Sequence, residues 1–183
     1  MSMHRAWLLT WTAYGTWLPG DSRGSVTRVR DCRADGTPRS EHDQFETPYL
    51  AEAPGLAFAS RAAMKGSSTR LTREQALVVA EDFEATAKYR NWAMPAGSVM
   101  ANHVHLVVIA LETTRSEKLL QILKSYASRA LNRRWELPTG SEWWTASGSR
   151  RPLRDDDAIE SASRYVRGQE YRLAECREIR SQS

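Results

Sequence analysis

The sequence from Val99 to Ile109 is Val-Met-Ala-Asn-His-Val-His-Leu-Val-Val-Ile, and the rest of the chain can be placed around it. Its apolar and β-branched residues predict a buried strand. Side chains two positions apart on a strand share a face, so we expect His103 and His105 to project together, about 7 Å apart along the backbone. Two neighbouring imidazoles form half of a metal site. The same pair is also compatible with histidines that are simply satisfied in a core or at the surface.

Composition bounds the class of protein. The 183 residues predict one domain over residues 1–183, with an irregular insertion at about residues 25–68. The chain is 41% hydrophobic and 26% charged, as is usual for a soluble protein, and its net charge of +4 favours a polyanionic partner. With two cysteines and no signal peptide or membrane span, we expect a cytoplasmic protein that does not act at a membrane.

Hydrophobic periodicity predicts the other elements. Beyond the histidine strand we expect strands at residues 6–14, 92–100 and 142–145, and helices at residues 72–89, 116–135 and 155–179. Pro95 and Gly97 favour an edge or bulged position for the strand at 92–100. Glycine, serine and proline predict a flexible basic linker at residues 147–154. This order of elements predicts an α+β fold, a central antiparallel sheet with helices packed against it.

A glycine-rich segment follows the first strand, between Gly15 and Gly24. Three glycines and one proline predict a loop there. We expect the loop to be ordered, because the side chains of Trp17 and Leu18 are costly to leave in water.

The last predicted helix carries Tyr165 and Gln169 four residues apart, which places both on one helix face. A half-buried tyrosine and a surface glutamine are the ordinary explanation for such a pair. Gly168 is less ordinary, because a glycine inside a helix costs roughly 1 kcal/mol relative to alanine. Its presence indicates a bend or a close approach at that point.

The His-hydrophobic-His strand and the helix with Tyr-x-x-x-Gln together resemble the single-tyrosine HUH transposases. These are the insertion-sequence and REP-associated tyrosine transposases that act on single-stranded DNA. The opening from Leu9 to Asp21 is similar to a variant opening in that group, and Ala101 stands where the family usually has proline. The resemblance covers most of the chain but not residues 25–68. The chain lacks the Asn-Pro that REP-associated members usually carry after the tyrosine.

The resemblance implies a ferredoxin-like HUH fold whose C-terminal helix carries the tyrosine. It implies that a divalent metal, Mg²⁺ or Mn²⁺, is held by His103, His105 and Gln169. It further implies that Tyr165 attacks a phosphodiester of single-stranded or hairpin DNA and forms a 5′-phosphotyrosine. A phenol has a pKa near 10 and is a workable leaving group, so the strand can be resealed without ATP or another nucleotide cofactor.

Basic residues near the proposed site are candidates for contacts with DNA phosphates, or they form an ordinary solvated face. These residues are Lys124, Arg129, Arg133, Arg150 and Arg151. The resembling transposases are homodimers that can combine the histidines of one subunit with the tyrosine of the other. A flexible linker at residues 147–154 would permit this, so we predict a homodimer with shared active sites.

Three other functions compete with a DNA-cleaving transposase. One is a catalytically silent or domesticated relative that binds hairpin DNA without cutting it. A second is an RNA-binding α+β domain whose aromatic side chains stack on bases, which leaves the histidine pair unexplained. A third is a metal-dependent hydrolase that uses His103, His105 and Asp21 with an activated water. Only the tyrosine mechanism requires Tyr165.

Overall fold

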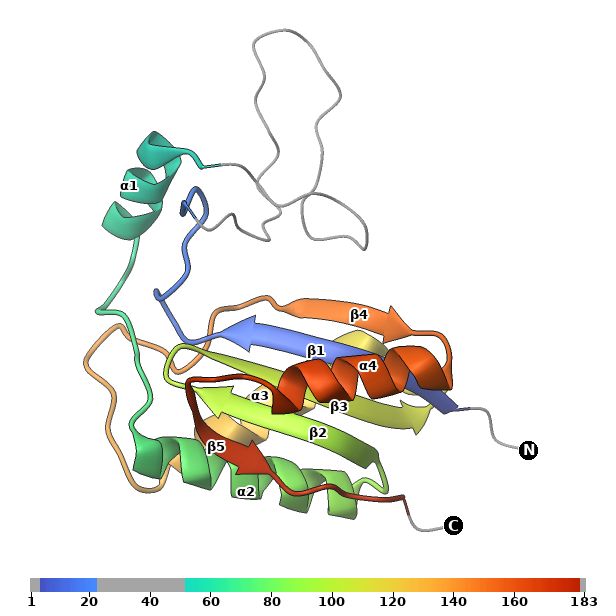
Figure 1. The fold of residues 1–183 in the computed structure, drawn as a ribbon. Helices are drawn as coiled ribbons and strands as arrows, with labels where there is room; N and C mark the ends of the chain where they lie inside the picture. The colour runs from blue at the N-terminus through green and yellow to red at the C-terminus, as the bar shows by residue number, and fades with distance from the viewer. Residues whose placement is uncertain (1–3, 23–51, 182–183) are drawn as a thin grey trace, which may run out of the picture.

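The computed structural model describes residues 4–22 and 52–181. Five antiparallel strands form one sheet in the order β4-β1-β3-β2-β5. The strands are β1 (His4–Thr12), β2 (Ala93–Met100), β3 (His103–Leu111), β4 (Ser149–Leu153) and β5 (Arg172–Cys176). The helices are α1 (Pro54–Ala62), α2 (Arg73–Tyr89), α3 (Ser116–Asn132) and α4 (Asp156–Arg167). Helices α2 and α3 cover one face of the sheet and α4 lies on the other, which confirms the predicted α+β fold (Figure 1).

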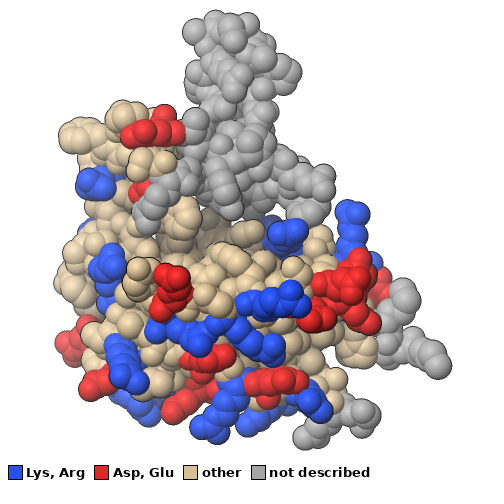
Figure 2. Space-filling view, viewed as in Figure 1, with Lys and Arg blue, Asp and Glu red and all other residues tan. Residues whose placement is uncertain are grey.

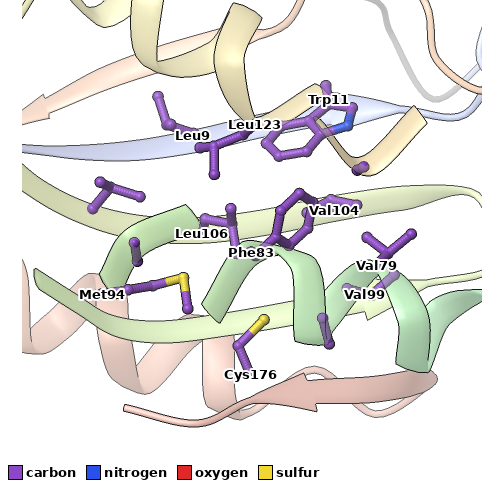
Figure 3. Packing of buried hydrophobic residues seen from close by; sticks show 14 of the residues in the cluster. Leu9, Trp11, Val79, Phe83, Met94, Val99, Val104, Leu106, Leu123 and Cys176 are labelled. Atoms are coloured by element: carbon purple, nitrogen blue, oxygen red, sulfur yellow. The ribbon is translucent and has the colours of Figure 1, made fainter. Parts of the chain in front are cut away.

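The main core lies between the sheet and the pair α2 and α3. Alternate residues of β3, including Val104 and Leu106, point into it and are fully buried. Trp11 of β1 meets Phe83 of α2 edge to face, with ring centroids 5.6 Å apart (Figure 3). Helix α2 begins as predicted, because Thr72 and Gln75 form a complete capping box.

A smaller core holds α4 against the opposite face of the sheet. Val166 of α4 is fully buried and belongs to a cluster with Val107 of β3 and Ala96 of β2. Val107 has the same strand parity as His103 and His105, so the histidines and α4 share one side of the sheet. This second layer determines where the helix meets the histidines.

The flexible linker predicted at residues 147–154 is wrong, because most of this segment is strand β4. It pairs with β1 from Thr10↔Ser149 to Ala6↔Leu153. Gly148 suits close packing here rather than flexibility, since a Cβ at that position would lie 2.8 Å from the Thr10 carbonyl oxygen. Pro152 is tolerated because β4 is an edge strand. The strand predicted at residues 142–145 is reduced to one isolated bridge at Trp144.

The last helix is shorter than predicted. It begins after Asp155, whose side chain accepts a hydrogen bond from the Ala158 backbone N–H, and it ends at Arg167 with Gly168 as its C-cap. Gly168 therefore lies at the end of the helix rather than inside it, so it does not bend the helix. Strand β5 follows α4. The prediction that the helix carrying the tyrosine is the C-terminal element is therefore wrong.

Two further expectations need correction. Helix α1 occupies part of the insertion predicted to be irregular at residues 25–68, of which residues 25–51 lie outside the described residues. Strand β2 is bulged between Ala93 and Ala96, as predicted, but it is not an edge strand because β5 pairs with it. Across the described ranges, no helix has both the length and the apolarity needed to cross a bilayer.

Candidate active site

The histidine pair sits on the central strand of the sheet. In the ladder, His105 lies opposite Thr10 of β1 and Ser98 of β2, while His103 lies opposite Thr12. The two imidazole rings pack edge to face, with centroids 4.9 Å apart. The shared face predicted from the spacing is therefore confirmed.

His105 is held in a defined orientation within the sheet. It is only 7% exposed, and its Nδ1 lies 2.7 Å from the hydroxyl oxygen of Thr10. Burial, with a smaller contribution from the charge of His103, lowers the pKa of His105 to about 4. The imidazole is therefore neutral at pH 7, which is the form that binds a metal ion.

His103 is oriented by its neighbour in the chain. Its Nδ1 lies 2.8 Å from Oδ1 of Asn102, and an amide oxygen can only accept a hydrogen bond. His103 Nδ1 is therefore the donor, and in the neutral imidazole Nε2 is the nitrogen with the lone pair. Hydrogen bonds of this kind behind a histidine fix its tautomer and ring direction at metal sites.

Tyr165 lies beside the histidines. It occupies the last turn of α4, its ring centroid is 5.4 Å from that of His105, and its side chain is 53% exposed. A single chain thus brings an accessible phenol and two imidazoles together. The next residue, Val166, is buried in the small core, so its packing fixes the turn that presents Tyr165.

The end of α4 is capped by side chains from three other positions. The last four carbonyls of a helix have no partner within it. In α4 the Arg164 carbonyl accepts a hydrogen bond from the Gly168 backbone N–H, and the Tyr165 carbonyl accepts one from Gln169 Nε2. The Val166 carbonyl accepts one from Ser98 Oγ, and the Arg167 carbonyl accepts one from an Arg172 guanidinium nitrogen. The turn that carries Tyr165 is therefore tied to β2 and β5 as well as to its own chain end.

Gln169 has a different place from the one predicted. It lies beyond the end of α4, so it does not share a helix face with Tyr165, and its amide nitrogen donates to the Tyr165 carbonyl oxygen at 3.2 Å. Among the described residues, no group of three or more His, Cys, Asp or Glu side chains is arranged to hold a metal ion. The hydrolase set of His103, His105 and Asp21 is therefore not assembled. Two oriented imidazoles, of which that of His105 is neutral at pH 7, fit a metal site that takes its remaining ligands from elsewhere.

A cleft of about 1620 Å³ opens above the histidines and Tyr165. It exceeds the roughly 300–1,000 Å³ of most small-molecule pockets, so its size suits a polymer. Its lining comes from β1 and the loop after it, from α3, from β4 and the segment before it, and from α4 as far as Tyr165. Lys and Arg side chains lie across the α4 face, and Asp and Glu side chains gather at the end where α4 begins (Figure 2).

The five basic residues expected to contact phosphates do not form one surface. Arg151 and Arg150 line the cleft, but Arg150 pairs with Glu117 at 3.5 Å. Lys124 donates to the carbonyls of Ala146 and Ser147 at 3.2 and 3.1 Å, and burial lowers its pKa to about 8. The other two lie on and beside α3: Arg129 stacks over the Tyr126 ring, and Arg133 is the C-cap residue of the helix.

A comparison with known protein families matches residues 62–169 to the family described as transposase IS200 like. The chain belongs to the IS200-like transposase family. The matched segment covers more than half of the sequence, includes both histidines and Tyr165, and ends at Gln169. A comparison with curated proteins finds no match.

Several residues that shape the candidate site were missed by sequence reasoning. Thr10 of β1 contacts His105, and Ser98 of β2 contacts α4. Neither contact has a signal in the sequence next to these residues. Asn102 precedes His103 directly, and a polar amide beside a candidate ligand was a usable signal. Thr10 also lies outside the segment that matches the transposase family.

Proposed function

We propose that the protein cleaves and rejoins single-stranded DNA, using Tyr165 as the nucleophile. Tyr165 Oη attacks the phosphorus of a phosphodiester, the bond from phosphorus to the 3′ oxygen breaks, and the phenolic proton ends on that oxygen. The products are a 5′-phosphotyrosine and a free 3′-hydroxyl. Attack by a 3′-hydroxyl on the phosphotyrosine reverses the step, which makes strand transfer possible without an external energy source.

The observation that carries this proposal is the position of Tyr165. Its half-exposed ring lies 5.4 Å from the ring of His105, at the floor of a cleft large enough for a nucleic acid strand. Membership of a transposase family supports the same reaction class. A core tyrosine would instead be buried, and Tyr126 illustrates an ordinary structural role, with its hydroxyl engaged by Arg90.

Each residue then has a defined task. His103 and His105 would bind Mg²⁺ or Mn²⁺ through Nε2, while Asn102 and Thr10 hold their Nδ1 atoms. A bound divalent cation would withdraw charge from the scissile phosphate as negative charge develops on it. Gln169 would have to leave the Tyr165 carbonyl to join this ligand set. Packing of α4 would hold the phenol toward the same phosphate.

We further propose that each chain acts with its own tyrosine. The prediction of shared sites depended on a flexible linker at residues 147–154, and that segment is strand β4. Helix α4 also packs on the sheet of its own chain, beside that chain's His105. A homodimer remains our proposal for the assembly, with two separate sites.

Covalent capture tests the proposed chemistry. The protein is incubated with radiolabelled single-stranded hairpins and Mn²⁺, and adducts that survive SDS are counted. Tyr165→Phe should abolish the adduct and leave binding nearly intact, because only the attacking hydroxyl is lost. The matched control is Tyr171→Phe, since Tyr171 is 85% exposed and lies six positions along the chain. A labelled adduct from the Tyr165→Phe protein would rule out Tyr165 as the nucleophile.

The same assay separates the other functions. A catalytically silent relative would bind hairpins and form no adduct with any variant. A water-using hydrolase would cut DNA equally well after Tyr165→Phe. An RNA-binding domain would prefer single-stranded RNA of the same sequence over DNA.

A further inference from the structure

The loop that follows β1 is built as a fixed wall beside the histidines. The Thr16 hydroxyl donates to the carbonyl oxygens of Ala13 and Asn102, at 2.8 and 3.0 Å. Asn102 is the residue whose side chain orients His103. The loop is therefore joined through one residue to a candidate metal ligand.

Further contacts fix the two ends of this loop. The Tyr14 backbone N–H donates to the Trp143 carbonyl and the Tyr14 carbonyl accepts from Thr69, while Gly20 accepts from the N–H of Ala53 just before α1. Gly15 has a φ of +68°, and a Cβ there would lie 2.2 Å from the Met64 methyl group. Only glycine fits that turn.

This wall is aromatic and apolar, and it lines the same cleft as the reacting groups. The cleft is lined by Tyr14, Trp17 and Pro19 of this wall, and also by His103 and Tyr165. Tyr14 and Trp17 are only partly buried. Trp17 directly follows Thr16, whose hydroxyl contacts the Asn102 carbonyl beside His103.

Charges in the cleft are mixed, which bears on what the wall can bind. Arg151 and Arg154 line it, as do Glu142 and Asp155. Asp155 is engaged in capping α4. A ligand that combines an anionic backbone with flat, apolar faces suits this cleft. Its backbone would contact the arginines, and its flat faces would contact the aromatic wall. Single-stranded nucleic acid has this chemistry.

We propose that Trp17, which lines the cleft with Tyr14, is a base-stacking subsite for a nucleotide flanking the scissile phosphate. The proposal rests on the proposed function, since it places the same DNA strand in the same cleft. Stacking on an aromatic side chain does not depend on the identity of the base, so this subsite adds affinity for single strands rather than for one sequence.

Two polymers separate base contacts from backbone contacts. One is a fluorescein-labelled oligothymidylate of about 16 nucleotides, the upper end of typical single-strand site sizes. The other has the same length and charge but carries abasic sites throughout. The wild-type protein should bind oligothymidylate roughly 5- to 150-fold more tightly, as measured by fluorescence anisotropy, which corresponds to one stacked base.

Trp17→Ala should remove most of that preference and leave affinity for the abasic polymer unchanged, whereas Trp17→Phe should retain much of it. Phe58→Ala is the control, because Phe58 is a 77% exposed aromatic residue on the neighbouring α1. Thermal unfolding of each variant identifies any that fail to fold; if Trp17→Ala is among them, Trp17→Leu replaces it and should lose the preference in the same way.

The outcomes separate the stacking subsite from the proposed reaction. A base preference that is the same in the wild type and in both Trp17 variants would overturn the stacking subsite and leave the proposed reaction standing. If the wild-type protein binds neither polymer, the proposed function and the stacking subsite are both overturned.

Discussion

Ser98 connects the strand beside the histidines to the helix that carries Tyr165, and Ser98→Ala tests whether that connection matters. Its side chain is fully buried, and its hydroxyl donates to the Val166 carbonyl oxygen at 2.7 Å. That carbonyl lies in the last turn of α4 and has no partner within the helix. Removing the hydroxyl leaves a buried acceptor unsatisfied, which costs about 1–3 kcal/mol. For a chain of this size each kcal/mol lowers Tm by about 2–4 °C.

The change should also alter catalysis more than binding. Val166 directly follows Tyr165, so loosening its carbonyl frees the turn that directs the phenol, while the cleft that binds DNA is unchanged. Small misplacements of a reacting group can reduce rates by up to about 100-fold. We expect slower single-turnover formation of the phosphotyrosine adduct at saturating DNA, with the Kd for single-stranded DNA unchanged.

Ser163→Ala is the matched control. Ser163 is also a buried serine on the α4 layer, only 4% exposed, but its hydroxyl has no hydrogen-bond partner among the described residues. Its removal should leave Tm the same or higher, and the adduct rate unchanged. Equal Tm and equal adduct rates for the Ser98 and Ser163 variants would refute the reasoning.

Two other predictions concern the metal and the assembly. His105→Ala should abolish Mn²⁺ binding measured by calorimetry, whereas Gln169→Ala should weaken it less, because the Gln169 amide is engaged with the Tyr165 carbonyl; equal losses would mean that Gln169 leaves the helix end to bind the metal. A mixture of His103→Ala and Tyr165→Phe subunits, allowed to exchange, should remain inactive, because Tyr165 lies beside His105 of its own chain. Cleavage by confirmed mixed dimers would show that the sites are shared.

Local patterns were sufficient for part of this fold. The alternation around His103 and His105 placed both rings on one face, and the Thr72 and Gln75 pair marked the start of α2. Each of these features depends on residues within a few positions of one another. They could be predicted because side-chain direction on a strand and capping at a helix end are local properties.

The errors arose where a residue has a local meaning and a different tertiary one. Gly148 and Pro152 are typical of a linker, yet β4 needs a glycine against the Thr10 carbonyl and tolerates a proline at the sheet edge. Gly168 has the sequence context of a glycine inside a helix, although it lies at the end of one. The predicted position of Gln169 is wrong for the same reason, because Gln169 shares a helix face with Tyr165 only if the helix continues past Gly168.

The candidate site depends on sheet register more than on any sequence motif. Thr10 and His105 are 95 residues apart in the chain, and Ser98 and Val166 are 68 apart, so neither contact has a local signature. A one-residue slip of β3 would turn both histidines toward the core of α2 and α3 and bring Val104 and Leu106 to the cleft. The apolar residues alternating with the histidines prevent this, because they are completely buried on the other face. The hydrophobic half of the strand thus holds its two imidazoles at the site, beside the tyrosine.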